Sequence, residues 1–341
     1  MNELEIAKKT SLYSDELRCK TVLVTGATGL IGKQFTDLLM HIGDIKVVAV
    51  GRDNAKIKRV FANYIDNKNF FTGIINGEVK TVFDKKVDYI VHCASPTRPE
   101  DFKADPAKVF FDNIRGIENI LNFAKEKKVK KMLYLSSVEV YGNPHENQKQ
   151  FAEDDYGVIN LADVRSAYPE SKRVCELLLA IRRAAGEVDY VIARPAKTFG
   201  ITPDESDKRA GTEFIRLASQ SKDIVLMTKG GQKFSFCYNA DVAAALLLLL
   251  IKGESGQAYN IASNNSDVSI FEFASVCAEV GNSNVIIKEQ SNTGHSTYSH
   301  TIVSIDKIKK LGFCPAYTLQ NGVRAAIEML RETNPINRGE K

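Results

Sequence analysis

Short apolar runs recur along the first 195 residues and alternate with amphipathic stretches. The runs that predict buried β-strands are Thr21–Thr25, Lys46–Val50, Tyr89–Cys93, Met132–Ser136 and Tyr190–Ala193. Near-continuous apolar character is typical of strands that helices cover on both faces. The segments with helical periodicity between them include Leu30–His41, Ile114–Lys128 and Ser171–Arg183. This alternation predicts a doubly wound parallel α/β sheet.

The pattern loosens after Pro195. Gly-, Asp- and Lys-rich loops surround shorter helices there, and the periodicity of Gly322–Thr333 predicts one more amphipathic helix. A chain of 341 residues is also too long for one minimal domain and suits a large α/β domain with a smaller second lobe. We therefore expect a sheet domain over 1–195 and a smaller C-terminal α/β lobe drawn mainly from 196–341. Some strands and helices of the second part are expected to return to the first.

The composition is that of a folded globular protein, with 44% apolar residues and 26% charged residues of both signs. The net charge of +4 is not gathered into a basic face, so nucleic acid is not an expected partner. The charged start lacks the apolar core of a signal peptide, and the longest apolar run, Ala243–Ile251, is too short to span a bilayer. Six scattered cysteines, with no CxxC pair and no histidine at metal-ligand spacing, predict a reduced cytoplasmic protein without metal or membrane binding.

A glycine-rich turn, TGATGLIG, joins the first predicted strand to the first predicted helix. Small residues at this place let the backbone approach a phosphate and let the helix pack on the sheet. Glycines at such a turn are often only turn residues, but this turn also opens a periodic helix within a βαβ unit. We therefore expect a cofactor pyrophosphate here, in an NAD(P)-binding Rossmann domain. The expected contacts are Gly26, Thr28, Gly29, Leu30, Ile31 and Gly32.

The residues after the second strand bear on which dinucleotide binds. An acidic residue at this strand end would hold the adenosine ribose, but Gly51 occupies the expected place. Arg52 can pair with a 2′-phosphate, with help from Lys56 or Arg59, which favours NADP over NAD. In the alternative interpretation the turn is merely basic and solvated, and Asp53 still reaches the ribose.

Tyr168 and Lys172 place a phenol and an ammonium four residues apart, so that on a helix they share one face. Removal of hydride from a carbinol also requires removal of its proton, and a phenol becomes a useful base only when a nearby cation stabilises the phenolate. The spacing alone is a common accident in amphipathic helices. Pro169 suits a first helical turn, so Tyr168 is expected near the helix start.

Hydroxyl and carboxyl groups follow the predicted strand Met132–Ser136. Ser137 and Glu139 lie at the carboxyl edge of the sheet, where ligands of such folds bind. A serine there can donate to a substrate oxygen or merely form a turn or cap, and Glu139 is either a second acid or base or a solvated loop residue. The neighbouring strand ends at His92 and Cys93, which we expect to pack in the core or at the loop edge.

Several motifs occur in order along the chain: TGATGLIG, HCAS (His92–Ser95), a helix with Asn113, LSSVEVYG, YPESK and ARPAKTFG. Together they resemble the extended short-chain dehydrogenase/reductase family of nucleotide-sugar epimerases, dehydratases and decarboxylases. The resemblance is greatest to UDP-glucuronate decarboxylases and dTDP-glucose 4,6-dehydratases, through SSVEVYG and EDDYGVINLADVRSAYPESKR.

The resemblance implies a tightly held nicotinamide that oxidises a sugar hydroxyl to a ketone and usually reduces it again later. Ser137, Tyr168 and Lys172 match the catalytic triad of the family, and Glu139 matches the glutamate of the decarboxylases and dehydratases. A homodimer formed through helices is also implied. The further cofactor contacts that the resemblance implies are Ala94, Ser95, Asn113, Tyr168, Lys172 and Arg194.

The substrate half departs from the pattern of the family. Val138 stands where dehydratases have Asp, and Lys197 and Glu213 each replace an Asn. Phe234 aligns with an Arg that contacts phosphate, and loss of such a contact costs roughly 1.5–3 kcal/mol. Lys197 and Lys233 are expected to compensate. We therefore expect a nucleotide-sugar-like substrate bound through Ser137, Glu139, Lys197, Glu213, Lys233 and Phe234, with ordinary UDP-glucuronate decarboxylation disfavoured by Phe234.

Two alternatives remain open. An NADP-dependent ketoreductase acting on a non-nucleotide or unusual sugar would release its cofactor after each turnover, whereas an epimerase-like enzyme retains it. A catalytically silent NAD(P)-binding regulatory protein would keep the fold without the chemistry, and the intact Ser137, Tyr168 and Lys172 argue against that alternative.

Overall fold

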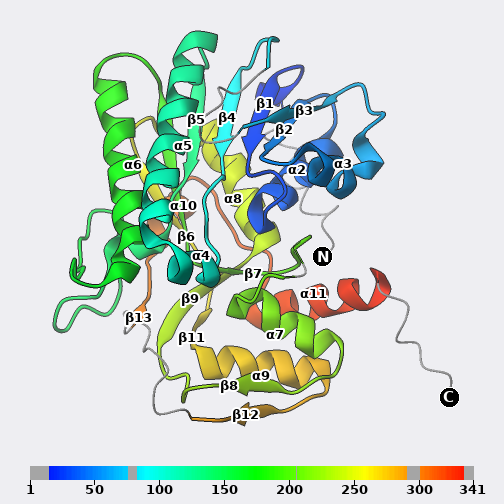
Figure 1. Cartoon of the computed structure of the whole chain (residues 1–341), viewed down its shortest axis with the longest axis vertical. Coiled ribbons are helices and arrows are strands. Elements are labelled where there is room, and N and C mark those ends of the chain that lie inside the picture. The colour runs from blue at the N-terminus through cyan, green and yellow to red at the C-terminus, as the bar shows by residue number, and fades with distance from the viewer. Residues whose placement is uncertain (1–14, 76–82, 205, 290–299, 334–341) are drawn as a thin grey trace.

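A seven-stranded sheet forms the larger part of the computed structural model, which describes residues 15–75, 83–204, 206–289 and 300–333 (Figure 1). The strand order is β10-β6-β5-β4-β1-β2-β3, and every neighbouring pair is parallel. The strands are β1 (Thr21–Thr25), β2 (Lys46–Gly51), β3 (Phe70–Ile74), β4 (Tyr89–His92), β5 (Lys131–Leu135), β6 (Tyr190–Pro195) and β10 (Ala258–Ile261). The predicted doubly wound Rossmann-type fold is confirmed.

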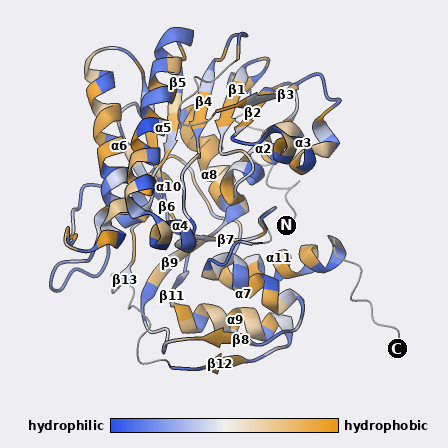
Figure 2. Cartoon of the chain, viewed as in Figure 1, coloured by the Kyte–Doolittle hydropathy of each residue, from blue (hydrophilic) through white to orange (hydrophobic). Residues whose placement is uncertain are grey.

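The two faces of this sheet bury alternate side chains of the same strands, because successive residues of a strand point in opposite directions. Val22 and Val24 pack with Phe35 of α2 (Leu30–Ile42) and Leu246 of α8 (Asn239–Lys252). Leu23 points the other way, into a core with α5 (Pro106–Lys127) and α6 (Ala167–Ala184). Figure 2 shows that α8 is apolar over most of its length, as expected for a helix buried on all sides.

The strand order reverses between β1 and β4. The chain runs from β1 outward to β2 and β3, then returns to the other side of β1 for β4, β5 and β6. Helices therefore leave the carboxyl ends of β1 and β4 on opposite faces, which opens a crevice between those strand ends. Thr25 and His92 are register partners at this point, and the Thr25 hydroxyl and His92 Nδ1 share a 2.8 Å hydrogen bond.

The remaining described residues build a smaller part, at the bottom of Figure 1. In it, β9 (Lys233–Tyr238) pairs with β7 (Lys197–Phe199), β11 (Asp267–Ser269) and β13 (His300–Thr301), while β8 (Ile224–Leu226) pairs with β12 (Val285–Ile287). The helices α7 (Ala210–Ser219), α9 (Ile270–Gly281) and α11 (Leu319–Thr333) pack on one another. Their core is rich in aromatic side chains, among them Phe199, Phe236 and Phe273.

Short helices complete the chain and bring side chains to the crevice. They are α3 (Asn54–Val60), α4 (Pro99–Ala104), α10 (Asp306–Lys310) and the 3-10 turns η2 (Ala62–Tyr64), η3 (Val138–Tyr141) and η4 (Val164–Ser166). The helix α6 begins at Ala167, four residues before the periodic segment Ser171–Arg183, and Tyr168 lies near its start as Pro169 predicted. The strands β3 and β10 were not predicted, and β10 shows that the second half of the chain contributes to the large sheet. The division at residue 195 stays a prediction.

Candidate active site

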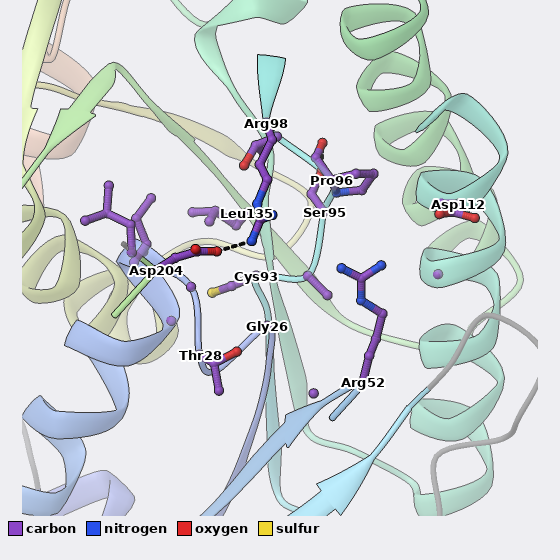
Figure 3. Close-up of a pocket in the computed structure, with 18 of the residues that line it drawn as sticks. Gly26, Thr28, Arg52, Cys93, Ser95, Pro96, Arg98, Asp112, Leu135 and Asp204 are labelled. Atoms are coloured by element: carbon purple, nitrogen blue, oxygen red, sulfur yellow. Dashed lines mark hydrogen bonds and ion pairs between the residues drawn. The ribbon is translucent and has the colours of Figure 1, made fainter. Parts of the chain in front are cut away.

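A cavity of about 590 Å³ lies at the carboxyl ends of the strands, where the order of the sheet reverses (Figure 3). Its wall includes many of the residues expected to contact a cofactor: Gly26, Thr28, Gly29, Leu30, Ile31, Gly32, Arg52, Ala94 and Ser95. The volume suits a bound small molecule of several linked rings. The glycine-rich turn and the HCAS segment, 66 residues apart from Gly26 to His92, therefore face one space.

The glycines of the turn are required by close backbone contacts. Gly26 has a φ of +64°, and a Cβ there would lie 2.7 Å from the Ala94 nitrogen. A Cβ on Gly32 would lie 2.2 Å from the Gly26 carbonyl oxygen. The helix α2 starts after Gly29 without a side-chain cap and without an acidic residue in its first turn. Its N-terminal N–H groups and positive dipole end thus suit a pyrophosphate, and the residues present fit a dinucleotide.

The adenosine end of the cavity is basic. Gly51, Arg52 and Lys56 line it, and Figure 3 shows Arg52 extending from the end of β2 into the space. Asp53 caps α3 instead, accepting a hydrogen bond from the Lys56 backbone N–H at 3.0 Å, and it is exposed and does not line the cavity. The alternative in which Asp53 reaches the ribose therefore has no support from this geometry. Arg59 does not line the cavity either.

Ser137, Tyr168 and Lys172 lie together beside the cavity. The Ser137 hydroxyl hydrogen-bonds the Tyr168 hydroxyl and also caps η3 by accepting from the Glu139 N–H at 3.1 Å. Lys172 Nζ lies 5.8 Å from the centre of the Tyr168 ring. Its ammonium donates to the Leu135 carbonyl at 2.9 Å, and Leu135 lines the cavity. The four-residue spacing on α6 thus does bring the phenol and the ammonium to one face.

Burial is the largest cause of the pKa shifts of Tyr168, Lys172 and the nearby His92 and Cys93. It raises the pKa of Tyr168, with a further rise from the Glu139 carboxylate, while Ser137, Arg165 and Arg209 act in the opposite direction. Burial lowers the pKa of Lys172 to about 8, and the side chain is only 2% exposed. Burial together with Lys172 lowers the pKa of His92 to about 3, so this ring is neutral at physiological pH. Burial raises the pKa of Cys93 to about 12, so its thiol is unreactive.

Asn113 links the cavity wall to α6 without lining the cavity itself. Its Nδ2 donates to Ser171 Oγ at 2.8 Å, and its Oδ1 accepts from Ser95 Oγ at 2.7 Å. The residue is buried, and both halves of its amide are satisfied by these serines. Asn113 therefore fixes the HCAS segment relative to α6.

Arg194, an expected cofactor contact, does not line the cavity. The side chain is buried against Glu176, with Nη2 donating to Oε2 at 2.6 Å and Nε donating to Oε1 at 3.0 Å. Its Nη1 donates to the Tyr141 hydroxyl at 2.9 Å and to the Glu153 carbonyl at 2.8 Å. All three nitrogens are engaged away from the cavity wall, so Arg194 joins β6 to α6 and to the loop before it.

The six expected substrate contacts fall into two groups. The first group lies near Tyr168 and consists of Ser137, Glu139, Lys197 and Phe234. Lys197 Nζ lies 4.1 Å from the centre of the Phe234 ring. The Glu139 carboxylate raises the pKa of both Tyr168 and Lys197. Burial lowers the pKa of Lys197. Glu213 lies on α7, where it pairs with Arg216 at 2.6 Å, and Lys233 is exposed at the start of β9. No contact of Glu213 or Lys233 with the Tyr168 group is seen among the described residues.

Several residues of the cavity wall were not predicted from the sequence as site residues. Arg98 forms an ion pair with Asp204 across the cavity (Figure 3), and Lys56 Nζ lies 3.6 Å from the same carboxylate. Arg209 also lines the cavity, where it pairs with Asp207 at 2.5 Å. The segment after β7 therefore crosses the opening. Only its density of charge marks it in the sequence, and that pattern is shared with ordinary surface loops.

Within the ranges that the structure describes, no group of three or more His, Cys, Asp or Glu side chains could hold a metal ion. Among the same residues, no helix has both the length and the apolar character needed to cross a membrane. All six cysteines are free thiols.

Comparisons with known proteins agree with the geometry. The sequence profile of the "NAD dependent epimerase/dehydratase family" matches residues 22–262. UDP-glucuronic acid decarboxylase 4 of Arabidopsis thaliana is 30% identical over 312 residues, which cover 91% of this chain and 68% of that protein. UDP-glucuronic acid decarboxylase 6 of the same plant is 30% identical, with 89% of this chain and 86% of that protein covered.

Solved structures share the fold at lower sequence identity. UDP-glucose 4-epimerase of Thermotoga maritima superposes with a TM-score of 0.76 at 19% identity, covering 92% of this chain and 99% of that one. UDP-glucuronic acid 4-epimerase of Bacillus cereus, solved with UDP-glucuronic acid and NAD, gives 0.74 at 21% identity, with 92% of this chain and all of that chain covered.

The depressed pKa of Lys172 has a measurable effect on stability. The pKa of Lys172 is near 8 in the folded protein and near 10.5 in the unfolded chain. Burial of the charged amine therefore destabilises the fold fully below pH 8. This destabilisation decreases as the pH rises from 8 towards 10.5. Between pH 7 and pH 9 the free energy of unfolding should therefore rise by about 1–1.5 kcal/mol more in the natural protein than in Lys172→Met. Urea titration of both proteins without cofactor measures this difference, and equal pH slopes would contradict it.

Proposed function

Because the chain belongs to the NAD dependent epimerase/dehydratase family, we propose that it is the nicotinamide-dependent enzyme that oxidises a hydroxyl of a nucleotide-linked sugar to a transient ketone. The observation that carries this proposal is the Ser137–Tyr168–Lys172 group beside the glycine-lined cavity. The names of the relatives, which are UDP-glucuronic acid decarboxylases, support a UDP-sugar as the first substrate to examine.

The roles of the side chains follow from their positions. A bound nicotinamide supplies the hydride acceptor. Tyr168 takes the proton of the sugar hydroxyl, Ser137 donates a hydrogen bond to the same oxygen, and the Lys172 ammonium stabilises the phenolate. The carbinol thus gives its O–H proton to Tyr168, and a bound nicotinamide would accept the hydride from the carbinol C–H; return of both would restore the alcohol. Arg165 and Arg209 are further cations that lower the pKa of the phenol.

We propose that Lys197 binds an oxygen of the substrate. It lies over the ring of Phe234 and has no hydrogen-bonded carboxylate among the described residues, so its charge is available to an anion.

Residues 1–195 are proposed to hold the cofactor, and residues 196–341 to supply most of the substrate contacts. A ketoreductase of non-nucleotide sugars is the second candidate, favoured by the departures from the family pattern at Lys197, Glu213 and Phe234.

A ligand panel tests the function. The purified protein should be stabilised against heat by at least one of a set of UDP-, dTDP-, CDP- and GDP-sugars. Tyr168→Phe should keep this binding and lose about 10²- to 10⁴-fold in turnover, because the proton acceptor is removed while the cavity is preserved. If no compound of the panel stabilises the protein against heat, the nucleotide-sugar proposal is refuted. Mass spectrometry of the purified protein separates the ketoreductase, which releases its cofactor, from an epimerase-like enzyme, which retains it.

We also propose that the cofactor is NADP rather than NAD. Arg52 and Lys56 face the adenosine end of the cavity, while Asp53 is engaged as the cap of α3. A guanidinium pairs well with a 2′-phosphate, and no carboxylate follows β2 at the position that would hold the ribose.

Substitution of Arg52 tests whether this side chain contributes to binding of NADP(H) and not of NAD(H). Arg52→Ala should weaken NADP(H) binding by roughly 10- to 100-fold, the value of a charge-assisted contact of about 1.5–3 kcal/mol, and leave NAD(H) binding nearly unchanged. Lys58→Ala on α3 is the matched control, because that lysine does not line the cavity. Calorimetry gives the dissociation constants of both dinucleotides for all three proteins. Tighter binding of NAD than NADP to the natural protein would overturn the proposed preference.

A homodimer formed through α5 and α6 is proposed as the assembled state. Phe111 on α5 is 50% exposed, and Leu177 and Ile181 on α6 are 59% and 52% exposed. Such side chains grouped on adjacent helices favour a protein partner. Leu177→Glu combined with Ile181→Glu should give a monomer in light scattering after size exclusion, whereas Phe271→Glu on α9 should not. A natural protein that is monomeric at micromolar concentration would contradict this proposal.

A cytoplasmic location is proposed as well. The free state of all six thiols supports it, since secreted proteins tend to oxidise paired cysteines. Cell fractionation tests the location.

A further inference from the structure

Arg165 stands three residues before Tyr168, in the 3-10 turn η4 that leads into α6. Its backbone N–H donates to Asp163 Oδ1 at 2.8 Å, which fixes the turn. None of the motifs read from the sequence includes this residue in a role. Its side chain nevertheless reaches the centre of the proposed active site.

The guanidinium of Arg165 is held between two rings and a carboxylate. It lies 4.3 Å from the centre of the Phe102 ring of α4 and 5.6 Å from the centre of the Tyr168 ring, and these two rings are themselves 5.3 Å apart. Its Nη2 donates to Glu139 Oε2 at 2.8 Å. Three separate elements, α4, η3 and the start of α6, therefore meet at this one side chain.

One buried nitrogen of the Arg165 guanidinium makes no hydrogen bond within the described part of the chain. Its Nη1 is buried and has no hydrogen-bond partner among the described residues, although the side chain as a whole is 30% exposed. Arg194 shows what a purely structural arginine looks like in this same fold, because all its nitrogens donate to Glu176, Tyr141 and Glu153. A buried donor left unpaired is destabilising, so its retention points to a role other than stability.

Among the described residues, charged and titratable groups from several elements face Tyr168. Glu139 from η3 raises the pKa of the phenol, and Arg165 from η4 and Arg209 from the segment before α7 lower it. On its own helix, the Lys172 ammonium lies 5.8 Å from the ring, and the Tyr134 phenol of β5 lies on the sheet side. Arg209 pairs with Asp207 at 2.5 Å, whereas Arg165 pairs with Glu139 itself, so Arg165 is the cation placed to offset the Glu139 carboxylate at Tyr168.

We propose that Arg165 is a positioning residue of the active site, which holds the Glu139 carboxylate at a fixed distance from Tyr168 and offsets its charge there. This inference rests on the proposed function, since it assigns to Tyr168 the role of proton acceptor. Glu139 can then act on the substrate without preventing ionisation of the phenol. Arginine suits the task because one flat group can stack on two rings and hold a carboxylate at its edge.

The test measures the ionisation of Tyr168 directly and needs no substrate. Protein labelled with ¹³Cζ-tyrosine and loaded with NAD⁺ or NADP⁺ is titrated by NMR, and Tyr168→Phe assigns the resonance. Arg165→Met should move the Tyr168 midpoint up by about 0.5–2 pH units, the effect of a unit charge 5–6 Å away between full solvent screening and ordinary protein screening. Glu139→Gln should move it down, and Arg165→Lys should restore much of the natural value because it keeps the charge.

Thermal unfolding supplies the control for a merely structural role. Because Nη1 is unpaired and the ion pair is partly exposed, Arg165→Met combined with Glu139→Gln should change Tm by no more than about 3 °C. Arg182→Met, at the far end of the same helix, should leave the Tyr168 titration unchanged. An unchanged Tyr168 midpoint in both Arg165 variants overturns the proposal, and so does a large loss of Tm in the double variant. Silence of the nucleotide-sugar panel would refute the proposed function alone, since this titration does not depend on it.

Discussion

The reversal of strand order between β1 and β4 is the constraint on which the rest of the structure depends. Because of it, α2 packs on one face of the sheet and the helix α5, which follows β4, packs on the other face. The carboxyl ends of β1 and β4 are therefore left uncovered. The backbones of Gly26, Gly32 and Ala94 then come so close that side chains are excluded at both glycines. A cavity bounded by backbone can bind a phosphate through N–H groups and needs no arginine for the purpose.

The same reversal explains why two charged side chains that look alike in the sequence differ in role. Arg194 ends β6 and points into the space between β6 and α6, where only protein atoms surround it. Arg165 sits in the turn that leads into α6, at the open edge of the sheet, where Glu139 and Tyr168 also arrive. Position relative to the crevice, and not residue type, separates a structural guanidinium from one beside the chemistry.

Sequence reasoning works well where a property is local. The strand Thr21–Thr25 and the approach of Lys172 to Tyr168 follow from apolar runs and helical spacing, and both are present in the structure. It fails where a feature depends on distant segments. The strand β10 lies beside β6 only because the chain returns to the large sheet, and Asp204 meets Arg98 only because the segment after β7 crosses the cavity. The pairing of Arg194 with Glu176 could not be foreseen for the same reason, since Glu176 belongs to another element.

The crossing segment also determines how the cavity is reached. Asp204 is held there by Arg98 and Lys56, two partly exposed side chains, so its attachment is electrostatic and the large apolar cores are not involved. Exposed ion pairs weaken as salt shortens the range of the field, to about 8 Å at physiological ionic strength. Raising the ionic strength therefore weakens the attachment of Asp204 beside the cavity, whereas the apolar packing of α2 and α8 on the large sheet does not depend on these ion pairs.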